Sequence, residues 1–203
     1  MQAGDLPGRP EGVLRNLLML ARSQYAVDLS MERLRDAHAR RKTHVGGSDF
    51  AGMGKVLATY LEAHSLLVSA ELFWKSLSAL HERVRVPGAR GWKHMREIAA
   101  ELRLHARTIE RTRACRQRIE QVDKRVKLRQ ADRQGAASRM TAAPIHGALG
   151  VFDGRCLVFG RERFDLGQIH AAVQRAGRTL APKLVAGFEP PPVRKPRARR
   201  RKA

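Results

Sequence analysis

The sequence predicts a mainly α-helical protein with a long antiparallel helical hairpin, a third and basic helical region, a small C-terminal ββα piece and a disordered basic tail. Two observations predict this class. Apolar residues recur at three- and four-residue steps over two long segments, which is the period of a helix. Aromatic residues are scarce, at 5%, which disfavours a large β-sandwich and favours helices packed through Leu, Ala, Val and Met.

The first helix is predicted from about Glu11 to Lys42, after a disordered lead over residues 1–10. Asp28 or Ser30 is a candidate interruption of this helix. Its apolar positions recur at helical steps and predict one amphipathic face: Leu14, Leu17, Leu18, Ala21, Tyr25, Leu29 and Leu34.

The second helix is predicted from about Asp49 to Arg85, after a turn over residues 43–48. A face as broad as the one it carries needs a partner, and the first helix is adjacent across a short turn. The two helices are therefore expected to form an antiparallel hairpin, which is also a candidate site of homo-oligomerisation. The apolar face comprises Phe50, Met53, Leu57, Tyr60, Leu61, His64, Leu67, Trp74, Leu77 and Leu80.

A third helical region is predicted over residues 92–134, after Pro87-Gly88 ends the hairpin. This region is rich in arginine. Between residues 103 and 133 there are eleven Lys and Arg against four Asp and Glu, a net charge of +7. We assign residues 11–134 to one helical domain and residues 135–147 to a linker.

Part of the third region resembles the helix-turn-helix of bacterial transcription factors of the LuxR and sigma-factor kind. An apolar residue followed by alanine, Ile98-Ala99, lies in the expected first helix, Leu102 closes it, and Leu104 follows as an apolar turn residue. Ile109 is the apolar anchor of the second helix, ten residues after that alanine. The resemblance implies a wedge of apolar side chains between two helices and a second helix that enters the major groove of DNA.

In that reading the exposed residues early in the second helix contact bases and phosphates. One continuous helix without a turn is the alternative, because apolar residues keep helical steps through this stretch. Either arrangement presents a basic face. The candidate nucleic-acid-binding residues of this region are Arg103, Arg107, Thr108, Arg111, Arg113, Arg116, Arg118, Lys124, Arg125 and Lys127.

Residues 148–181 have a different sequence pattern, with two short apolar runs around Asp153-Gly154, and predict a β-hairpin followed by a short helix. Asp153-Gly154 between two apolar runs is a strong signal for a two-residue hairpin turn. Asp165 with Gln168 three residues on fits a capping box, and Gly177 is expected to end the helix.

Residues 182–203 are predicted to be a disordered basic tail, because a proline-rich, acid-free end cannot bury a core. Such a run serves as a nucleic-acid arm or as a nuclear import signal. Its basic residues are Arg194, Lys195, Arg197, Arg199, Arg200, Arg201 and Lys202.

No cofactor, metal site or catalytic constellation is predicted, and we expect the protein not to be an enzyme. Cys115 and Cys156 lie far apart and outside metal-ligand spacing of any histidine. Cys115, flanked by arginines, is expected to be a buried structural thiol. The N-terminus lacks the pattern of a signal peptide, and no apolar stretch is long enough for a bilayer, so an intracellular protein without membrane insertion is expected. Its place would be the cytoplasm or nucleoid of a bacterium, or the nucleus in a eukaryotic or viral setting.

The charge balance gives the main functional expectation. Forty Lys and Arg face nineteen Asp and Glu, a net charge of +21. Such a surplus is the electrostatic signature of a nucleic-acid binder. We expect an accessory or regulatory protein that binds DNA rather than RNA. The alternative is a viral or other structural assembly protein whose hairpin oligomerises and whose basic surface holds genome or acidic partners nonspecifically.

Overall fold

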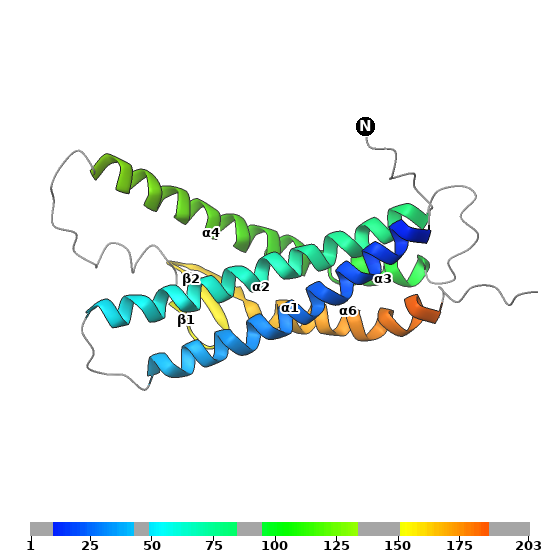
Figure 1. The fold of residues 1–203 in the computed structure, drawn as a ribbon, viewed down its shortest axis with the longest axis horizontal. Coiled ribbons are helices and arrows are strands. Elements are labelled where there is room, and N and C mark those ends of the chain that lie inside the picture. The colour runs from blue at the N-terminus through cyan, green and yellow to red at the C-terminus, as the bar shows by residue number, and fades with distance from the viewer. Residues whose placement is uncertain (1–9, 43–48, 85–94, 134–150, 187–203) are drawn as a thin grey trace, which may run out of the picture.

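The computed structural model describes residues 10–42, 49–84, 95–133 and 151–186, and within them it confirms the mainly α-helical class (Figure 1). The predicted disordered lead, the predicted linker and the arginine-rich end of the predicted tail fall outside these ranges. The elements in chain order are α1 (Pro10–Lys42), α2 (Asp49–Val84), α3 (Met95–Leu104), α4 (Ala106–Arg133), β1 (Val151–Phe152), β2 (Cys156–Phe159), β3 (Glu162–Asp165) and α6 (Leu166–Ala186).

Helices α1 and α2 form the predicted antiparallel hairpin (Figure 1). The hydroxyl of Ser30 donates to the hydroxyl of Ser65 at 3.0 Å across the pair. Ser30 does not interrupt α1, and neither does Asp28. The nearby Ser23 is also buried, and its hydroxyl bonds the carbonyl oxygens of Met19 and Leu20 one turn back. Polar residues are therefore tolerated inside the hairpin because their hydrogen bonds are made locally.

The buried face of α1 differs from the predicted one. Leu14, Leu18 and Tyr25, which were assigned to the packed face, are exposed. The helix carries apolar residues on two opposite faces, and only one of them packs against the rest of the protein. The residues that are buried are Leu20, Val27, Met31 and Leu34.

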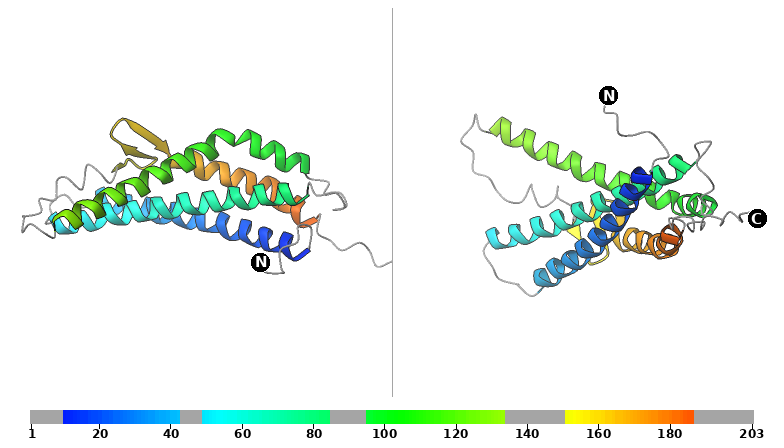
Figure 2. Two further views of the ribbon diagram at one scale, coloured as in Figure 1. Left: turned by 90° about the horizontal axis from the view of Figure 1, so that it is seen from above. Right: turned by 45° about the vertical axis from the view of Figure 1, so that its right-hand side comes forward.

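A second layer, built from α4, the sheet and α6, covers one side of the hairpin (Figure 2). The sheet is a three-stranded antiparallel meander in the order β1-β2-β3, so the predicted hairpin has a third strand that the sequence reading missed. Phe73 and Trp74 of α2, Ile119 of α4, Leu157 of β2 and Val173 of α6 belong to one buried apolar cluster. The two layers therefore share a single core.

The first hairpin turn is held by Asp153. Its carboxylate accepts the backbone N–H groups of Arg155 at 2.9 Å and Cys156 at 2.6 Å. The N–H of Asp153 donates to the carbonyl of Cys156 at 3.0 Å, so Gly154 and Arg155 stand at the centre of the turn. Gly154 has a φ of 103°, which a residue with a side chain rarely adopts. The predicted turn is present, displaced by one residue along the chain.

Helix α6 begins as predicted and ends later than predicted. The carboxylate of Asp165 accepts the N–H of Gln168 at 2.8 Å, which is an N-cap. The helix then continues through Gly177 and Pro182 to Ala186, so the predicted stop and the predicted start of the disordered tail at residue 182 are both wrong. Gly177 is buried inside the helix, and a Cβ at this position would overlap the side chain of Gln24. This glycine allows a close helix contact instead of ending the helix.

Candidate nucleic-acid interface

A single residue, His105, separates α3 from α4. The N–H of His105 donates to the carbonyl of Glu101 at 3.0 Å, and its own carbonyl accepts the N–H of Ile109 at 2.9 Å. Helical hydrogen bonds therefore continue through the junction, although the helix changes direction there (Figure 2). Leu104, the expected turn residue of the wedge, is 63% exposed. The junction is a bend in one helical run, and the helix-turn-helix prediction is corrected accordingly.

The bend is stabilised by contacts of the His105 side chain. Its ring lies 5.4 Å from the indole ring of Trp74 between centroids, and its Nε2 lies 3.3 Å from a carboxylate oxygen of Glu101. Burial lowers the pKa of His105 below its usual value of 6.5; Glu101 acts to raise it, and Arg175 of α6 lowers it further. The imidazole is therefore neutral at physiological pH, and Arg175 lies close to the junction.

The predicted basic residues of α4 do not form one row. Residues separated by four and eleven positions share a helix face, so Arg107, Arg111 and Arg118 point to the same side. Arg113 points elsewhere, because it lies six positions after Arg107. Thr108 is half-buried, and its carbonyl accepts the hydroxyl of Thr112 at 2.7 Å. Of these residues, Thr108 is the one least available for a DNA groove.

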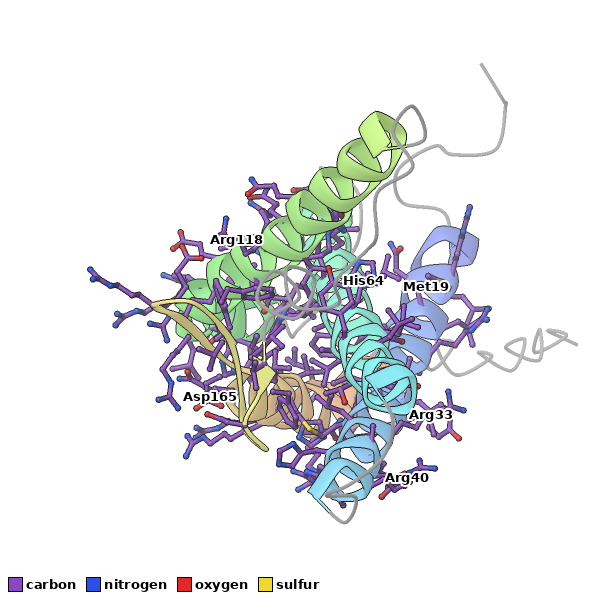
Figure 3. All side chains as sticks on the ribbon, turned by 90° about the vertical axis from the view of Figure 1, so that its left-hand side faces the viewer. Met19, Arg33, Arg40, His64, Arg118 and Asp165 are labelled. Carbon is purple, nitrogen blue, oxygen red and sulfur yellow. The ribbon has the colours of Figure 1, made fainter. Side chains whose placement is uncertain are left out.

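Two of the predicted arginines form ion pairs within the protein. Arg116 places Nη1 2.7 Å from Glu71 of α2 and Nε 3.1 Å from Glu120. Arg118 places Nε 3.1 Å from Glu162 at the start of β3 (Figure 3). These pairs tie α4 to the hairpin and to the sheet. They also reduce the charge that these two side chains can offer to a ligand.

Other arginines, which the sequence reading missed, lie on the sheet and on α6. Arg155 and Arg163 are paired with Asp165 and Asp153 at 2.7 and 2.8 Å. Arg161, Arg175 and Arg178 are exposed. The sequence did indicate this basic surface, because Arg175 and Arg178 lie three positions apart. The predicted end of the helix at Gly177 placed Arg178 outside the helix.

Among the exposed arginines that form no ion pair with any described residue, five lie on α4, α6 and the turn between β2 and β3, and we call these five the arginine face: Arg107, Arg111, Arg161, Arg175 and Arg178. Three contacts relate them in space. Arg118, on the same side of α4 as Arg107, touches Glu162, which follows Arg161. Arg175 acts on His105, the residue at which α3 ends and α4 begins. Arg178 follows Arg175 by three positions and so lies near it on the helix surface. The five residues therefore lie on three neighbouring elements: α4, the turn between β2 and β3, and α6.

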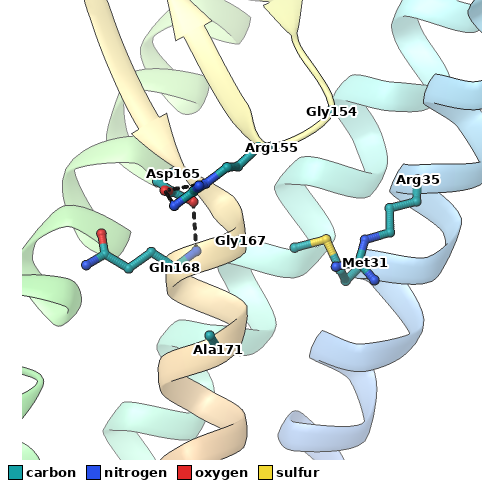
Figure 4. A pocket seen from close by; sticks show the side chains of 8 residues that line it. All are labelled: Met31, Arg35, Gly154, Arg155, Asp165, Gly167, Gln168 and Ala171. Atoms are coloured by element: carbon teal, nitrogen blue, oxygen red, sulfur yellow. Dashed lines mark hydrogen bonds and ion pairs between the residues drawn. The ribbon is translucent and has the colours of Figure 1, made fainter.

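A cleft of about 630 Å³ lies on another part of the surface, between α1, the first hairpin turn and the start of α6 (Figure 4). Arg155 and Asp165 in its wall neutralise each other, and Asp165 already caps the first turn of α6. Its lining residues are Met31, Arg35, Gly154, Arg155, Asp165, Gly167, Gln168 and Ala171. The cleft holds no arrangement of an acid, a base and a nucleophile.

The described residues contain no group of three or more His, Cys, Asp or Glu side chains placed to hold a metal ion. Cys115 is buried, as expected, and burial, with a contribution from Glu162, raises its pKa to about 12. Such a thiol is unreactive. Among the helices in the described ranges, none combines the length and the apolar character that crossing a membrane requires.

Of the remaining predicted residues, Arg103 lies exposed near the end of α3, where its Nε donates to the carbonyl oxygen of Ala99 at 3.2 Å. The others are not placed. Lys124, Arg125 and Lys127 belong to α4, but their side chains lie outside the described part of the structure, as does the whole run from Arg194 to Lys202. No protein-family model matches the chain, and comparisons with curated proteins and with solved structures gave no match.

Proposed function

We propose that the protein binds nucleic acid, with duplex DNA as the first candidate, through the phosphate backbone. The arginine face carries this proposal, because its five exposed guanidinium groups, free of ion pairs with described residues, lie on neighbouring elements of a chain with a net charge of +21. Arginine is the side chain best suited to phosphate, since its planar group donates two parallel hydrogen bonds. Each phosphate that is neutralised releases counterions, which favours binding at low salt.

Binding of this kind has little sequence preference. Helix α4 follows α3 after the single residue His105, with helical hydrogen bonds continuing between them, and Thr108 near its start is half-buried. Backbone contacts position a protein on DNA without reading its bases. The proposed role is therefore that of an accessory protein that holds DNA, and a role as a sequence-specific regulator has less support.

The proposal is tested by fluorescence-anisotropy titration of mixed-sequence duplex DNA over a salt series. We expect the combined change of Arg107, Arg111 and Arg175 to glutamine to reduce the slope of log affinity against log salt by about 2 to 3, since each lost phosphate contact removes about 0.9. The matched control changes Arg15, Arg22 and Arg33 of α1, which are exposed and free of ion pairs with described residues. Equal losses in both triple variants would show that only total charge matters. A duplex RNA of the same length shows whether DNA is preferred.

A structural role through self-association is the second candidate function. The observation that favours it is the outer face of α1, where Leu14, Leu18 and Tyr25 are exposed at heptad-like steps. Sedimentation velocity over a concentration series tests it. Self-association that disappears when Leu18 and Tyr25 are changed to glutamate would support the structural role, and a monomer at all concentrations would exclude it.

A further inference from the structure

Helix α2 carries an exposed row of apolar residues, which we call the α2 apolar row: Leu57, Leu61, Val68 and Leu72. The three leucines are 46%, 56% and 40% exposed, and Val68 is half-buried. The other sides of α2 contribute Tyr60, Leu66, Leu67, Phe73, Trp74 and Leu77 to the core. Helix α2 is therefore apolar around most of its circumference. A helix with this pattern is normally covered on all sides.

The row lies between α1 and α4. The ion pair between Glu71 and Arg116 brings α4 against α2 at the residue next to Leu72. The hydrogen bond between Ser30 and Ser65 brings α1 against the other side of α2. Figure 3 shows α2, which carries His64, between α4 on one side and α1, which carries Met19, on the other.

Arginines flank the row on both sides. On α1, Arg22 and Arg33 share a helix face with Met19, at separations of three and fourteen residues, and both are exposed. Because the helices are antiparallel and Ser30 lies opposite Ser65, Arg22 lies beside the turn that holds Leu72, and Arg33 lies beside the turn that holds Leu61. On α4, Arg113 is exposed and lies one turn before Arg116. The apolar row thus runs between two cationic edges.

We propose that the α2 apolar row binds an acidic amphipathic helix of another protein. Leucine-like side chains of the partner would pack on Leu57, Leu61, Val68 and Leu72, and carboxylates on its flanks would meet Arg22 and Arg33 on one side and Arg113 on the other. Recognition of an amphipathic helix through anchors spaced by three and four residues is a common mode of binding. Opposite charges at the rim add specificity and speed association.

A second copy of the chain fits this surface less well. A two-fold axis along α2 would bring the α1 edge of one copy to the α4 edge of the other. A two-fold axis across α2 would bring like edges together. Arginine meets arginine in both arrangements, and the net charge of +21 on each copy adds repulsion.

The test uses a synthetic, fluorescently labelled peptide of about 18 residues, with leucines at helical steps and glutamates on both flanks. A scrambled peptide of identical composition controls for attraction by charge alone. We expect the protein to bind the amphipathic peptide at least about tenfold more tightly than the scrambled one. Changing Leu61 and Leu72 to glutamine is expected to remove this difference.

The matched control changes Leu14 and Leu18 to glutamine, since Leu18 is 57% exposed and Leu61 is 56% exposed. This control variant is expected to bind the peptide as tightly as the wild type does. Circular dichroism is used to check that both variants keep their fold. Changing Arg22 and Arg33 to glutamate is expected to weaken binding and to make it less sensitive to salt.

Three results would overturn the proposal. The scrambled peptide could bind as tightly as the amphipathic one, or both leucine pairs could weaken binding equally. Alternatively, sedimentation could show a dimer of the wild-type chain that only the change at Leu61 and Leu72 dissociates, in which case a second copy is the occupant. Binding to DNA through the arginine face is measured separately, so failure of either proposal leaves the other testable.

Discussion

The imidazole of His105 packs against the indole of Trp74, with 5.4 Å between the ring centroids, at the residue where α3 ends and α4 begins. Burial keeps the pKa of His105 below 6.5, and the charge of Arg175 acts in the same direction, against the effect of Glu101. A neutral ring therefore packs at the bend between α3 and α4, close to Arg175 of α6. Protonation of this imidazole at lower pH would place a charge in the buried contact at the bend.

Stability is expected to fall on mild acidification because of His105. The unfolded chain binds a proton near pH 6.5, whereas the folded chain binds it only at lower pH, so the free energy of unfolding decreases as the pH is lowered through 6.5. Changing His105 to phenylalanine keeps a ring against Trp74 and removes the titration. Urea denaturation at several pH values between about 7.5 and 5 should give a flatter pH profile for the variant. Parallel profiles for both proteins would contradict this assignment.

Alanine at position 177 is expected to destabilise the protein, against the usual effect of replacing glycine inside a helix. A Cβ there would overlap Gln24, so the contact between α1 and α6 must open at a cost of about 1 to 3 kcal/mol. Changing Gln24 to alanine in the same chain should recover most of the loss. The control is Gly54 of α2, whose Cβ would meet no atom within 4 Å. Alanine at that position is expected to stabilise by about 0.5 to 1 kcal/mol, as judged by urea denaturation.

Arg116 is expected to contribute to the free energy of unfolding, whereas Arg113 is expected to contribute little. Changing Arg116 to methionine leaves the carboxylate of Glu71, which is only 10% exposed, with Lys75 as its remaining ion-pair partner among the described residues. A buried charge that loses a partner costs about 1 to 3 kcal/mol. The same change at Arg113, which is exposed, should alter the free energy of unfolding by less than about 0.5 kcal/mol. Similar losses in the two variants would mean that the ion pair with Glu71 contributes little.

Asp165 is expected to stabilise the start of α6. Burial raises the pKa of its carboxyl group, but the hydrogen bonds from Arg155 and from the backbone of Gln168 and Gly167 outweigh that effect and hold the pKa below 3.8. Changing it to alanine should cost about 1 kcal/mol at neutral pH, as for other N-caps. Asparagine retains an acceptor and should cost less. The contribution of the charge is lost as the pH falls below 3.8, so thermal melts of wild type and variant should converge in acid.

The helical hairpin was predictable from the sequence to within two residues at each end, because its signal is local: apolar residues at helical steps with a glycine-rich turn between them. Which face of α1 packs was not predictable. Leu14 and Leu18 are as apolar as Leu20 and Leu34, and only the positions of α2 and α6 decide between them. The strand β3 was missed because Glu162 and Arg163 lie exposed in it, so it shows no apolar alternation.

The candidate interface was predictable in its charge and not in its geometry. Nothing in the sequence distinguishes Arg116, which pairs with Glu71, from Arg113, which is exposed. Nor does it indicate that Arg175 of the last helix lies near His105, about 70 residues earlier in the chain. Ion pairs and contacts of this kind form only when segments distant in sequence pack together. The sequence pattern alone therefore does not reveal them.

The contact between Gln24 and Gln174 joins the first described helix to the last one, across 150 residues of chain. During synthesis α1 and α2 can pair as soon as both have left the ribosome, but the second layer exists only after α6 has emerged. Until then the nascent hairpin exposes Phe73, Trp74 and neighbouring apolar residues to solvent. Chains that stop before residue 166 are therefore expected to be held by chaperones or to aggregate, and the order of synthesis makes the last helix the step that completes folding.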